Sequence, residues 1–304
     1  MADRIPVSGR TVLVTGAARG IGAATARELA RRGANVALVG LEPEELGRVA
    51  AECGPGAAAF EADVTDVGAL ERARDGAIER FGGLDAVVAN AGIGSGGLIR
   101  SIDPQAWERI IEVNLLGTWR TVRACLPAIE ERRGYVAVVA SVASALHGPL
   151  MSAYAASKAA VEALARSLRI EEAHHGVGVG VAYLSWLTTE LVTGADEHPA
   201  FRQMRAGLRG PFARTYPVEA AAAALADGIE SRARDIVYPA WVRGVLAGRT
   251  GMQRLSERDA LAQMPELEAA VEREIAAEGA EAASRAVGAG GAADASRPGA
   301  GRPG

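Results

Sequence analysis

The sequence of 304 residues has almost no lysine, since its 33 cationic residues comprise 32 arginines and a single lysine, Lys158. Asparagine is nearly as rare, with Asn35, Asn90 and Asn114. A GC-rich coding bias accounts for this composition, because it exchanges lysine for arginine wherever any surface cation is sufficient. At a chemical site the two residues differ, since arginine is a planar fork and lysine a compact ammonium. The surviving lysine therefore indicates a position where arginine would fail.

Other scarce features exclude whole classes of protein. Cys53 and Cys125 lie far apart and outside any CxxC spacing, which excludes a disulfide framework and gives no metal signature. The net charge of −4 and the pI of about 5.7 argue against binding to nucleic acid. We find no apolar run long enough to span a bilayer and no secretory signal in MADRIPVSGR (1–10). We therefore expect a cytoplasmic protein with reduced thiols and no bound metal.

Short β-branched runs alternate with helical periodicity between residues 11 and 184. TVLVTG (11–16), NVALVG (35–40) and YVAVVAS (135–141) are typical of strands, and the segments that separate such runs are typical of helices. This alternation predicts an α/β fold, a Rossmann-like doubly wound parallel β-sheet with helices on both faces. We expect one domain over residues 1–256, a helical extension at 257–279 and a disordered Ala/Gly/Pro-rich tail at 280–304.

The turn after the first predicted strand, TGAARGIG (15–22), has glycines at positions 16, 20 and 22. This spacing differs from the GxGxxG dinucleotide fingerprint. Glycines between a strand and a helix nevertheless let the backbone approach a pyrophosphate, and the helix N-terminus favours the anion. The motif alone is also consistent with an ordinary glycine-rich turn.

Polar residues follow at the ends of later predicted strands and in two helices. They are Asp63-Val64, Asn90-Ala91-Gly92, Asn114, Ser141, and Tyr154 with Lys158 in AYAASK (153–158). Together with the glycine-rich turn, these motifs resemble the short-chain dehydrogenase/reductase (SDR) family over residues 8 to about 240. In a doubly wound sheet such strand ends converge on the crevice where ligands bind.

The resemblance implies an oxidoreductase that transfers a hydride between a nicotinamide cofactor and a carbonyl or secondary alcohol. Tyr154 would exchange a proton with the substrate oxygen, and Lys158 would lower the pKa of Tyr154 and donate to the nicotinamide ribose. Four residues apart, the two side chains would share a helix face. Ser141 would hydrogen-bond the substrate oxygen, and Asn114 would hold a water of the proton relay. The single lysine would then be a catalytic one.

The resemblance also implies a set of cofactor contacts: Gly16, Arg19, Gly20, Ile21, Gly22, Leu41, Asp63, Val64, Asn90, Ala91, Gly92, Tyr154, Lys158 and Thr189. NAD users of the family carry Asp at the end of the second strand, where this chain has Gly40. Arg19 matches a basic position common in NADP users and could pair with a 2′-phosphate. We favour NADP(H), while Glu42 leaves NAD(H) possible.

The chain departs from the family after the sixth predicted strand, where Leu184 and Ser185 replace the usual Pro-Gly. Residues 188–216 should form a substrate lid, as this segment does in the family. We place Ser141, His147, Tyr154 and Trp186 in the substrate pocket. A loop histidine without a role and a tryptophan buried in the core are the alternatives. The apolar character of this region predicts a bulky apolar substrate.

The family commonly pairs its two long helices in a dimer, here expected at 104–133 and 152–175, so we expect a homodimer or homotetramer. Two other functions stay open on the same fold: a redox-neutral dehydratase or epimerase, and a cofactor-binding regulatory or scaffold protein. The intact set of Asn114, Ser141, Tyr154 and Lys158 argues against the scaffold, because such proteins commonly lose the tyrosine or the lysine.

Overall fold

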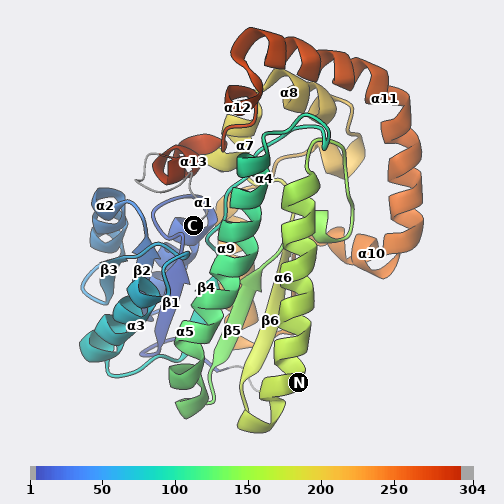
Figure 1. The fold of residues 1–304 in the computed structure, drawn as a ribbon. Helices are drawn as coiled ribbons and strands as arrows, with labels where there is room; N and C mark the ends of the chain where they lie inside the picture. The colour runs from blue at the N-terminus through green and yellow to red at the C-terminus, as the bar shows by residue number, and fades with distance from the viewer. Residues whose placement is uncertain (1–4, 296–304) are drawn as a thin grey trace.

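The computed structural model describes residues 5–295, which form a seven-stranded parallel sheet between two layers of helices (Figure 1). The strands are β1 (Thr11–Thr15), β2 (Asn35–Gly40), β3 (Ala57–Glu61), β4 (Ala86–Ala89), β5 (Tyr135–Val139), β6 (Gly178–Leu184) and β7 (Asp235–Tyr238). Their order is β3-β2-β1-β4-β5-β6-β7, and every neighbouring pair is parallel. The order reverses between β1 and β4, which opens a crevice at the carboxyl ends of these strands. The predicted α/β fold is confirmed.

Alternation along the strands divides the core into two halves. In β1, Leu13 packs into one cluster of buried residues, and Val12 and Val14 pack into the other. The first cluster lies under α3 (Val67–Phe81), α5 (Gly117–Glu131) and α6 (Ser152–Glu171). The second lies under α1 (Gly20–Arg31), α2 (Pro43–Cys53) and α9 (Val218–Glu230). Continuous apolar strands are required here because both faces of the sheet are covered.

The helical stretch expected at 104–133 is divided by a π-helical turn. It consists of α4 (Pro104–Ile111), the turn η1 (Glu112–Leu116) and α5. Asn114 lies in the turn and is completely buried. An inserted residue of this kind rotates the following side chains, and such bulges often occur at functional sites. Short 3₁₀ turns follow at η2 (Val142–Ser144), η3 (Glu172–His175) and η4 (Gly210–Ala213).

Five of the remaining helices gather at the carboxyl end of the sheet (Figure 1). They are α7 (Glu190–Ala195), α8 (Pro199–Ala206), α11 (Arg249–Glu278), α12 (Ala280–Ala283) and α13 (Gly288–Ala295). The short helix α10 (Val242–Ala247) lies apart from them. Leu267 and Val271 of α11 pack with Phe201 and Met204 of α8 in a third apolar cluster. We call residues 249–291, which cross above the lid, the roof segment.

The structure differs from the expected disorder of residues 280–304. Residues 280–283 and 288–295 are helical, and the rest of the predicted tail, 296–304, lies outside the described residues. The prediction rested on the scarcity of large apolar groups, but Val287 is only 7% exposed, and its amide donates to the Gly94 carbonyl over 2.8 Å. One buried valine and a few hydrogen bonds thus hold a segment whose composition favours disorder. The helical extension likewise begins at Arg249 rather than at residue 257.

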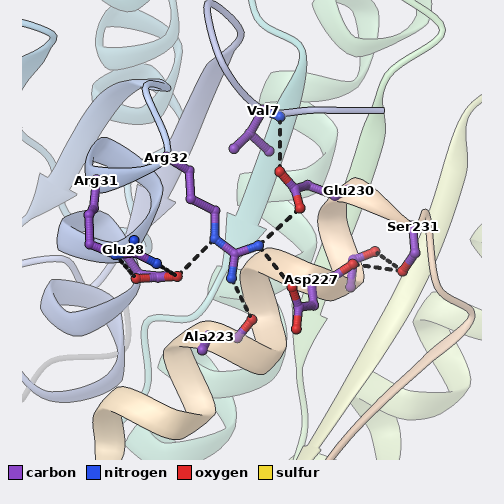
Figure 2. Close-up of polar contacts among 9 residues, drawn as sticks. Val7, Glu28, Arg31, Arg32, Ala223, Asp227, Glu230 and Ser231 are labelled. Atoms are coloured by element: carbon purple, nitrogen blue, oxygen red, sulfur yellow. Dashed lines mark hydrogen bonds and ion pairs between the residues drawn. The ribbon is translucent and has the colours of Figure 1, made fainter. Parts of the chain in front are cut away.

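An ion-pair network joins α1 to α9 on the far side of the sheet from α5 and α6 (Figure 2). The guanidinium of Arg32 lies 2.8 Å from Glu28, 2.9 Å from Asp227 and 3.0 Å from Glu230. Glu28 also accepts hydrogen bonds of 2.7 Å from Arg31. The network fixes the C-terminal end of α1, whose N-terminal end carries the glycine-rich turn. None of the helices in residues 5–295 is both long and apolar enough to cross a membrane.

Candidate active site

The glycine-rich turn between β1 and α1 packs so closely that side chains are excluded. Gly16 has a φ of +64°, and a Cβ atom there would lie 2.9 Å from the Cα of Ala91. A Cβ atom on Gly22 would overlap the carbonyl oxygen of Gly16. Only glycine allows this close approach. The turn therefore presents bare backbone at the N-terminus of α1, which suits a phosphate group.

Asn90 joins the end of β4 to the end of β1. Its amide nitrogen Nδ2 donates to the carbonyl oxygen of Thr15 over 2.8 Å, and its backbone N–H donates to Thr15 Oγ1 over 3.0 Å. These bonds satisfy backbone hydrogen-bonding groups at the ends of β1 and β4, on both sides of the crevice. Ala91 and Gly92 are thereby held against the glycine-rich turn.

The buried amide of Asn114 is hydrogen-bonded to protein groups through both its oxygen and its nitrogen. Its Oδ1 accepts from the backbone N–H of Ile93 over 2.8 Å, and its Nδ2 donates to the carbonyl of Ile93 and to Ser157 Oγ over 3.0 and 3.1 Å. Ile93 follows Asn90-Ala91-Gly92 directly. Asn114 thus fixes the chain after β4 and joins it to α6.

Tyr154 and Lys158 lie one turn apart near the beginning of α6. The Lys158 Nζ lies 5.7 Å from the centroid of the Tyr154 ring. Burial raises the pKa of Tyr154, and a side-chain hydrogen bond with Ser141 acts in the opposite direction. Ser141 follows β5, and Tyr154 comes from the helix that packs beside it. The structure therefore brings together the three residues that the sequence assigns to the substrate oxygen and its proton.

Lys158 is buried, with 4% of its surface exposed, and its Nζ donates to the carbonyl of Val139 over 2.8 Å. Burial lowers the pKa of its ammonium from 10.5 to about 8. An arginine fork would need more volume and more acceptors than one carbonyl provides.

These residues surround a cavity of about 370 Å³ at the carboxyl end of the sheet. Most of the predicted site residues line it: Gly16, Arg19, Gly20, Ile21, Leu41, Asp63, Val64, Asn90, Ala91, Gly92, Ser141, Tyr154, Lys158, Trp186 and Thr189. Gly22 and Asn114 do not line it and instead support its wall from behind. Thr189 lies over the glycine-rich turn, since a Cβ atom on Gly20 would be 3.5 Å from its methyl group.

His147 does not line the cavity, so its placement in the substrate pocket is wrong. The residue is exposed, and its Nδ1 contacts the carbonyl of Ala143 over 3.1 Å. Its backbone N–H donates to Gln253 at the beginning of the roof segment over 2.8 Å. The neighbouring Leu146 and Gly148 line the cavity in its place.

The expected lid, residues 188–216, contains α7, α8 and η4. Phe201, Met204 and Phe212 line the cavity, and Trp186 packs edge-on against Phe201 with the ring centroids 5.9 Å apart. The four lid arginines, Arg202, Arg205, Arg209 and Arg214, are absent from the wall. Arg205 instead pairs with Asp196 and lies over the outer face of the Trp186 ring. Apart from Thr189, Glu190 and His198, the lid presents apolar side chains to the cavity.

The basic residue of the glycine-rich turn, Arg19, is already paired. Its Nε lies 2.6 Å from Glu42 Oε1, and its Nη1 lies 3.3 Å from Glu190 Oε2. Glu42 and Glu190 also line the cavity. From the sequence alone Arg19 is expected to be an unpaired cation, because nothing in the sequence indicates that Glu190 contacts it.

The roof segment supplies site residues that the sequence reasoning missed. Val271, Glu274 and Ile275 of α11 line the cavity, as does Val287. Glu274 Oε1 lies 2.7 Å from Nδ1 of His198, which immediately precedes α8 and also lines the cavity. The helical pattern of 257–279 was visible, but no sequence signal relates residue 274 to residue 198.

Comparisons with known proteins agree with this geometry. A family model described as short chain dehydrogenase matches residues 10–200. An uncharacterized NAD-dependent oxidoreductase of Mycobacterium tuberculosis is 39% identical over 190 residues, which cover 56% of this chain and 69% of the relative. The cis-4-hydroxycyclohexanecarboxylate dehydrogenase of Sinomonas cyclohexanicum is 35% identical over 221 residues, 71% of this chain and 88% of the relative.

Among solved structures, the 3-ketoacyl-(acyl-carrier-protein) reductase from Brucella melitensis complexed with NADH is similar to this chain. It has a TM-score of 0.69 and 27% sequence identity, and the match covers 77% of this chain and 98% of the reductase. A short-chain type dehydrogenase/reductase from Mycobacterium marinum matches with a TM-score of 0.70 and 28% identity, over 78% of this chain and 96% of that one. By its sequence, its sheet order and the residues around its cavity, the chain belongs to the short-chain dehydrogenase/reductase family of oxidoreductases.

Proposed function

We propose that the protein interconverts a ketone and a secondary alcohol on a largely apolar small molecule, with a nicotinamide cofactor as hydride donor or acceptor. The observation that carries this proposal is the position of Ser141 and Tyr154, beside the buried Lys158, together in the wall of the cavity. A hydroxyl pair beside an ammonium suits proton transfer to an oxygen atom. The apolar lid above it suits a substrate of few polar groups.

The residues on the crevice fit a nicotinamide dinucleotide. The bare backbone of Gly16, Gly20 and Ile21 would hold the pyrophosphate at the N-terminus of α1, and Asp63 and Val64 would border the adenine. Thr189 and Lys158 would hold the nicotinamide end. When bound, the cofactor supplies or accepts the hydride.

The protein's own part in the reaction is the proton. In ketone reduction Tyr154 donates its phenolic proton to the substrate oxygen, and Ser141 donates a hydrogen bond to the same atom. Burial raises the pKa of Tyr154, and a Lys158 ammonium beside the ring would favour the phenolate form that accepts the proton back. Asn114 keeps the 90–93 segment in place and positions the wall opposite Tyr154.

Two substitutions test this assignment with a panel of cyclic and linear ketones and reduced cofactor. Tyr154→Phe removes only the hydroxyl, so we expect turnover to fall by roughly 10²-fold or more while cofactor binding persists. Lys158→Arg should fold and lose most of its activity, because the fork cannot place one donor in that space. Circular dichroism and thermal unfolding check the fold. Near-wild-type turnover of either variant would contradict the assignment, and product formation without net cofactor consumption would favour redox-neutral chemistry.

We further infer that the cofactor is NAD(H), in contrast to the sequence-based preference for NADP(H). Arg19 is neutralised by Glu42 and Glu190, so a 2′-phosphate would have to displace one carboxylate and lie beside the other. Glu42 is instead placed to accept hydrogen bonds from ribose hydroxyls. The mycobacterial relative named as NAD-dependent supports the same choice.

Thermal shifts with NAD⁺ and NADP⁺ test the cofactor preference. We expect NAD⁺ to stabilise the wild type more than NADP⁺, and Glu42→Gln to lose roughly tenfold in NAD⁺ affinity while gaining affinity for NADP⁺. Glu44→Gln, at an exposed position in the first turn of α2, is the matched control. A wild type that prefers NADP⁺ and loses this preference in Arg19→Ala would restore the original choice.

A further inference from the structure

The roof segment closes the substrate side of the cavity with the chain's own residues. It is attached to the loop after β4, because Asp103 N–H donates to Ser284 Oγ over 3.0 Å and Val287 N–H donates to the Gly94 carbonyl over 2.8 Å. Its inner surface is apolar at Val271, Ile275 and Val287. A substrate therefore contacts the roof as well as the lid.

One polar pair interrupts this apolar surface. His198 Nδ1 and Glu274 Oε1 are 2.7 Å apart, with side chains only 11% and 8% exposed. Both residues line the cavity. Burial of a carboxylate among apolar groups costs several kcal/mol, and a buried pair is often no more stabilising than apolar residues of the same shape. Packing of the roof on the lid alone does not require this pair.

The pair leaves hydrogen-bonding capacity unused. The contact engages one ring nitrogen of His198 and one carboxylate oxygen of Glu274. In the part of the chain that the structure describes, Nε2 of His198 and Oε2 of Glu274 make no other hydrogen bond. A carboxylate can accept several hydrogen bonds, and a neutral imidazole that donates through Nδ1 accepts through Nε2. Two acceptors are thus available, Glu274 Oε2 in the roof and His198 Nε2 in the lid.

The charges around the cavity decide which ligand group these acceptors suit. Of the lysine and arginines in residues 5–295, Arg19 and Lys158 line the cavity, and both lie beside the glycine-rich turn or Tyr154. The roof and lid therefore present no fixed cation to a substrate carboxylate, and Glu274 would repel one. A hydroxyl group can donate to either acceptor without this penalty.

We propose that His198 and Glu274 form a substrate subsite that binds a second hydroxyl group, remote from the reacting oxygen, on an otherwise apolar substrate. The inference rests on the proposed function. The proposed substrate differs from a hydroxycyclohexanecarboxylate, because that molecule carries a carboxylate anion in place of the second hydroxyl group.

The test compares methyl ketones of increasing chain length, each with and without a terminal hydroxyl group, as substrates with reduced cofactor. For the wild type we expect the hydroxylated ketone to exceed its plain counterpart by about tenfold in kcat/KM at the matching length. Glu274→Gln should abolish most of this preference, mainly by raising the KM of the hydroxylated ketones. Glu272→Gln, two residues along α11 on its exposed side, is the control and should keep the preference.

The double variant His198→Phe, Glu274→Leu keeps the test decisive if the single variant is unstable. It replaces the pair by apolar groups, so it should fold and invert the preference in favour of the plain ketones. The proposal is overturned if the wild type shows no preference at any length, or if Glu274→Gln changes kcat/KM equally for both series. Absence of turnover with every ketone, despite cofactor binding, would instead refute the proposed reaction and this subsite with it.

Discussion

At the scale of single residues, Lys158 shows a conflict between stability and function. Its ammonium is buried, and among the described residues no carboxylate pairs with it. Burial lowers its pKa from 10.5 to about 8, so between these values the unfolded chain binds more protons than the folded one. The stability of the folded state therefore rises as the pH rises through this window. Below it the full penalty applies, roughly 3 kcal/mol.

Lys158→Met should relieve this penalty. We expect the free energy of unfolding to increase by about 1–3 kcal/mol near pH 7, a gain that fades as the pH approaches about 10.5, while activity is lost. Urea unfolding across this pH range gives the measurement. Arg243→Met, at an exposed position, should show no such pH dependence. If Lys158→Met destabilises the protein at every pH, groups other than the Val139 carbonyl stabilise the ammonium.

At the scale of the elements, the Arg32 network couples α1 to α9, and its contribution to stability also rises with pH, but in the acid range. Hydrogen bonds from Arg31, and then from Arg32, hold the pKa of Glu28 below its usual range. A depressed carboxylate pKa adds stability that is present above the unfolded pKa and is lost as the pH falls through the folded value. Glu28→Gln should therefore cost roughly 1 kcal/mol near pH 7 and almost nothing in strong acid.

Urea unfolding of wild type and Glu28→Gln between neutral and acid pH measures this loss. Glu219→Gln, at an exposed position in the first turn of α9, supplies the matched control. Ketone turnover should be unchanged, since none of these residues lines the cavity. A constant difference between wild type and Glu28→Gln at every pH would show that the carboxylate charge does not contribute.

Much of the element order and of the candidate site could be predicted from the sequence, because both depend on local patterns. Glycines 16, 20 and 22 mark a turn, and a spacing of four residues puts Tyr154 and Lys158 on one helix face. The π-helical turn at Asn114 could not be seen, since one inserted residue barely changes the hydrophobic periodicity. His147 was misplaced for a related reason, because a loop position between two site residues does not fix the direction of its side chain.

At the scale of the whole molecule, the contacts that complete the cavity join segments far apart in the sequence. Arg19 meets Glu190, His198 meets Glu274, and Gly94 meets Val287. Each rests on one or two atoms, so composition and periodicity carry no trace of it. The charge state of Arg19 and the enclosure of the cavity, the two features that bear most on cofactor and substrate, therefore required the structure.

The roof should detach from the cavity most easily between α12 and α13. In that stretch Val287 is the main buried apolar contact. Val287→Asp would bury a carboxylate beside the Gly94 carbonyl, which favours detachment of this stretch. We expect faster proteolysis near residues 279–291 and a kcat/KM for plain ketones lowered by about tenfold, mainly through KM, because the substrate loses apolar contacts. The unfolding of the sheet itself should be unaffected, since the two main core clusters are intact.

Leu255→Asp is the matched control, because it adds the same charge at an exposed position of α11. It should change neither the rate of proteolysis nor kcat/KM. Unchanged kinetics in Val287→Asp, despite faster proteolysis, would show that the roof covers the cavity without contributing to substrate binding.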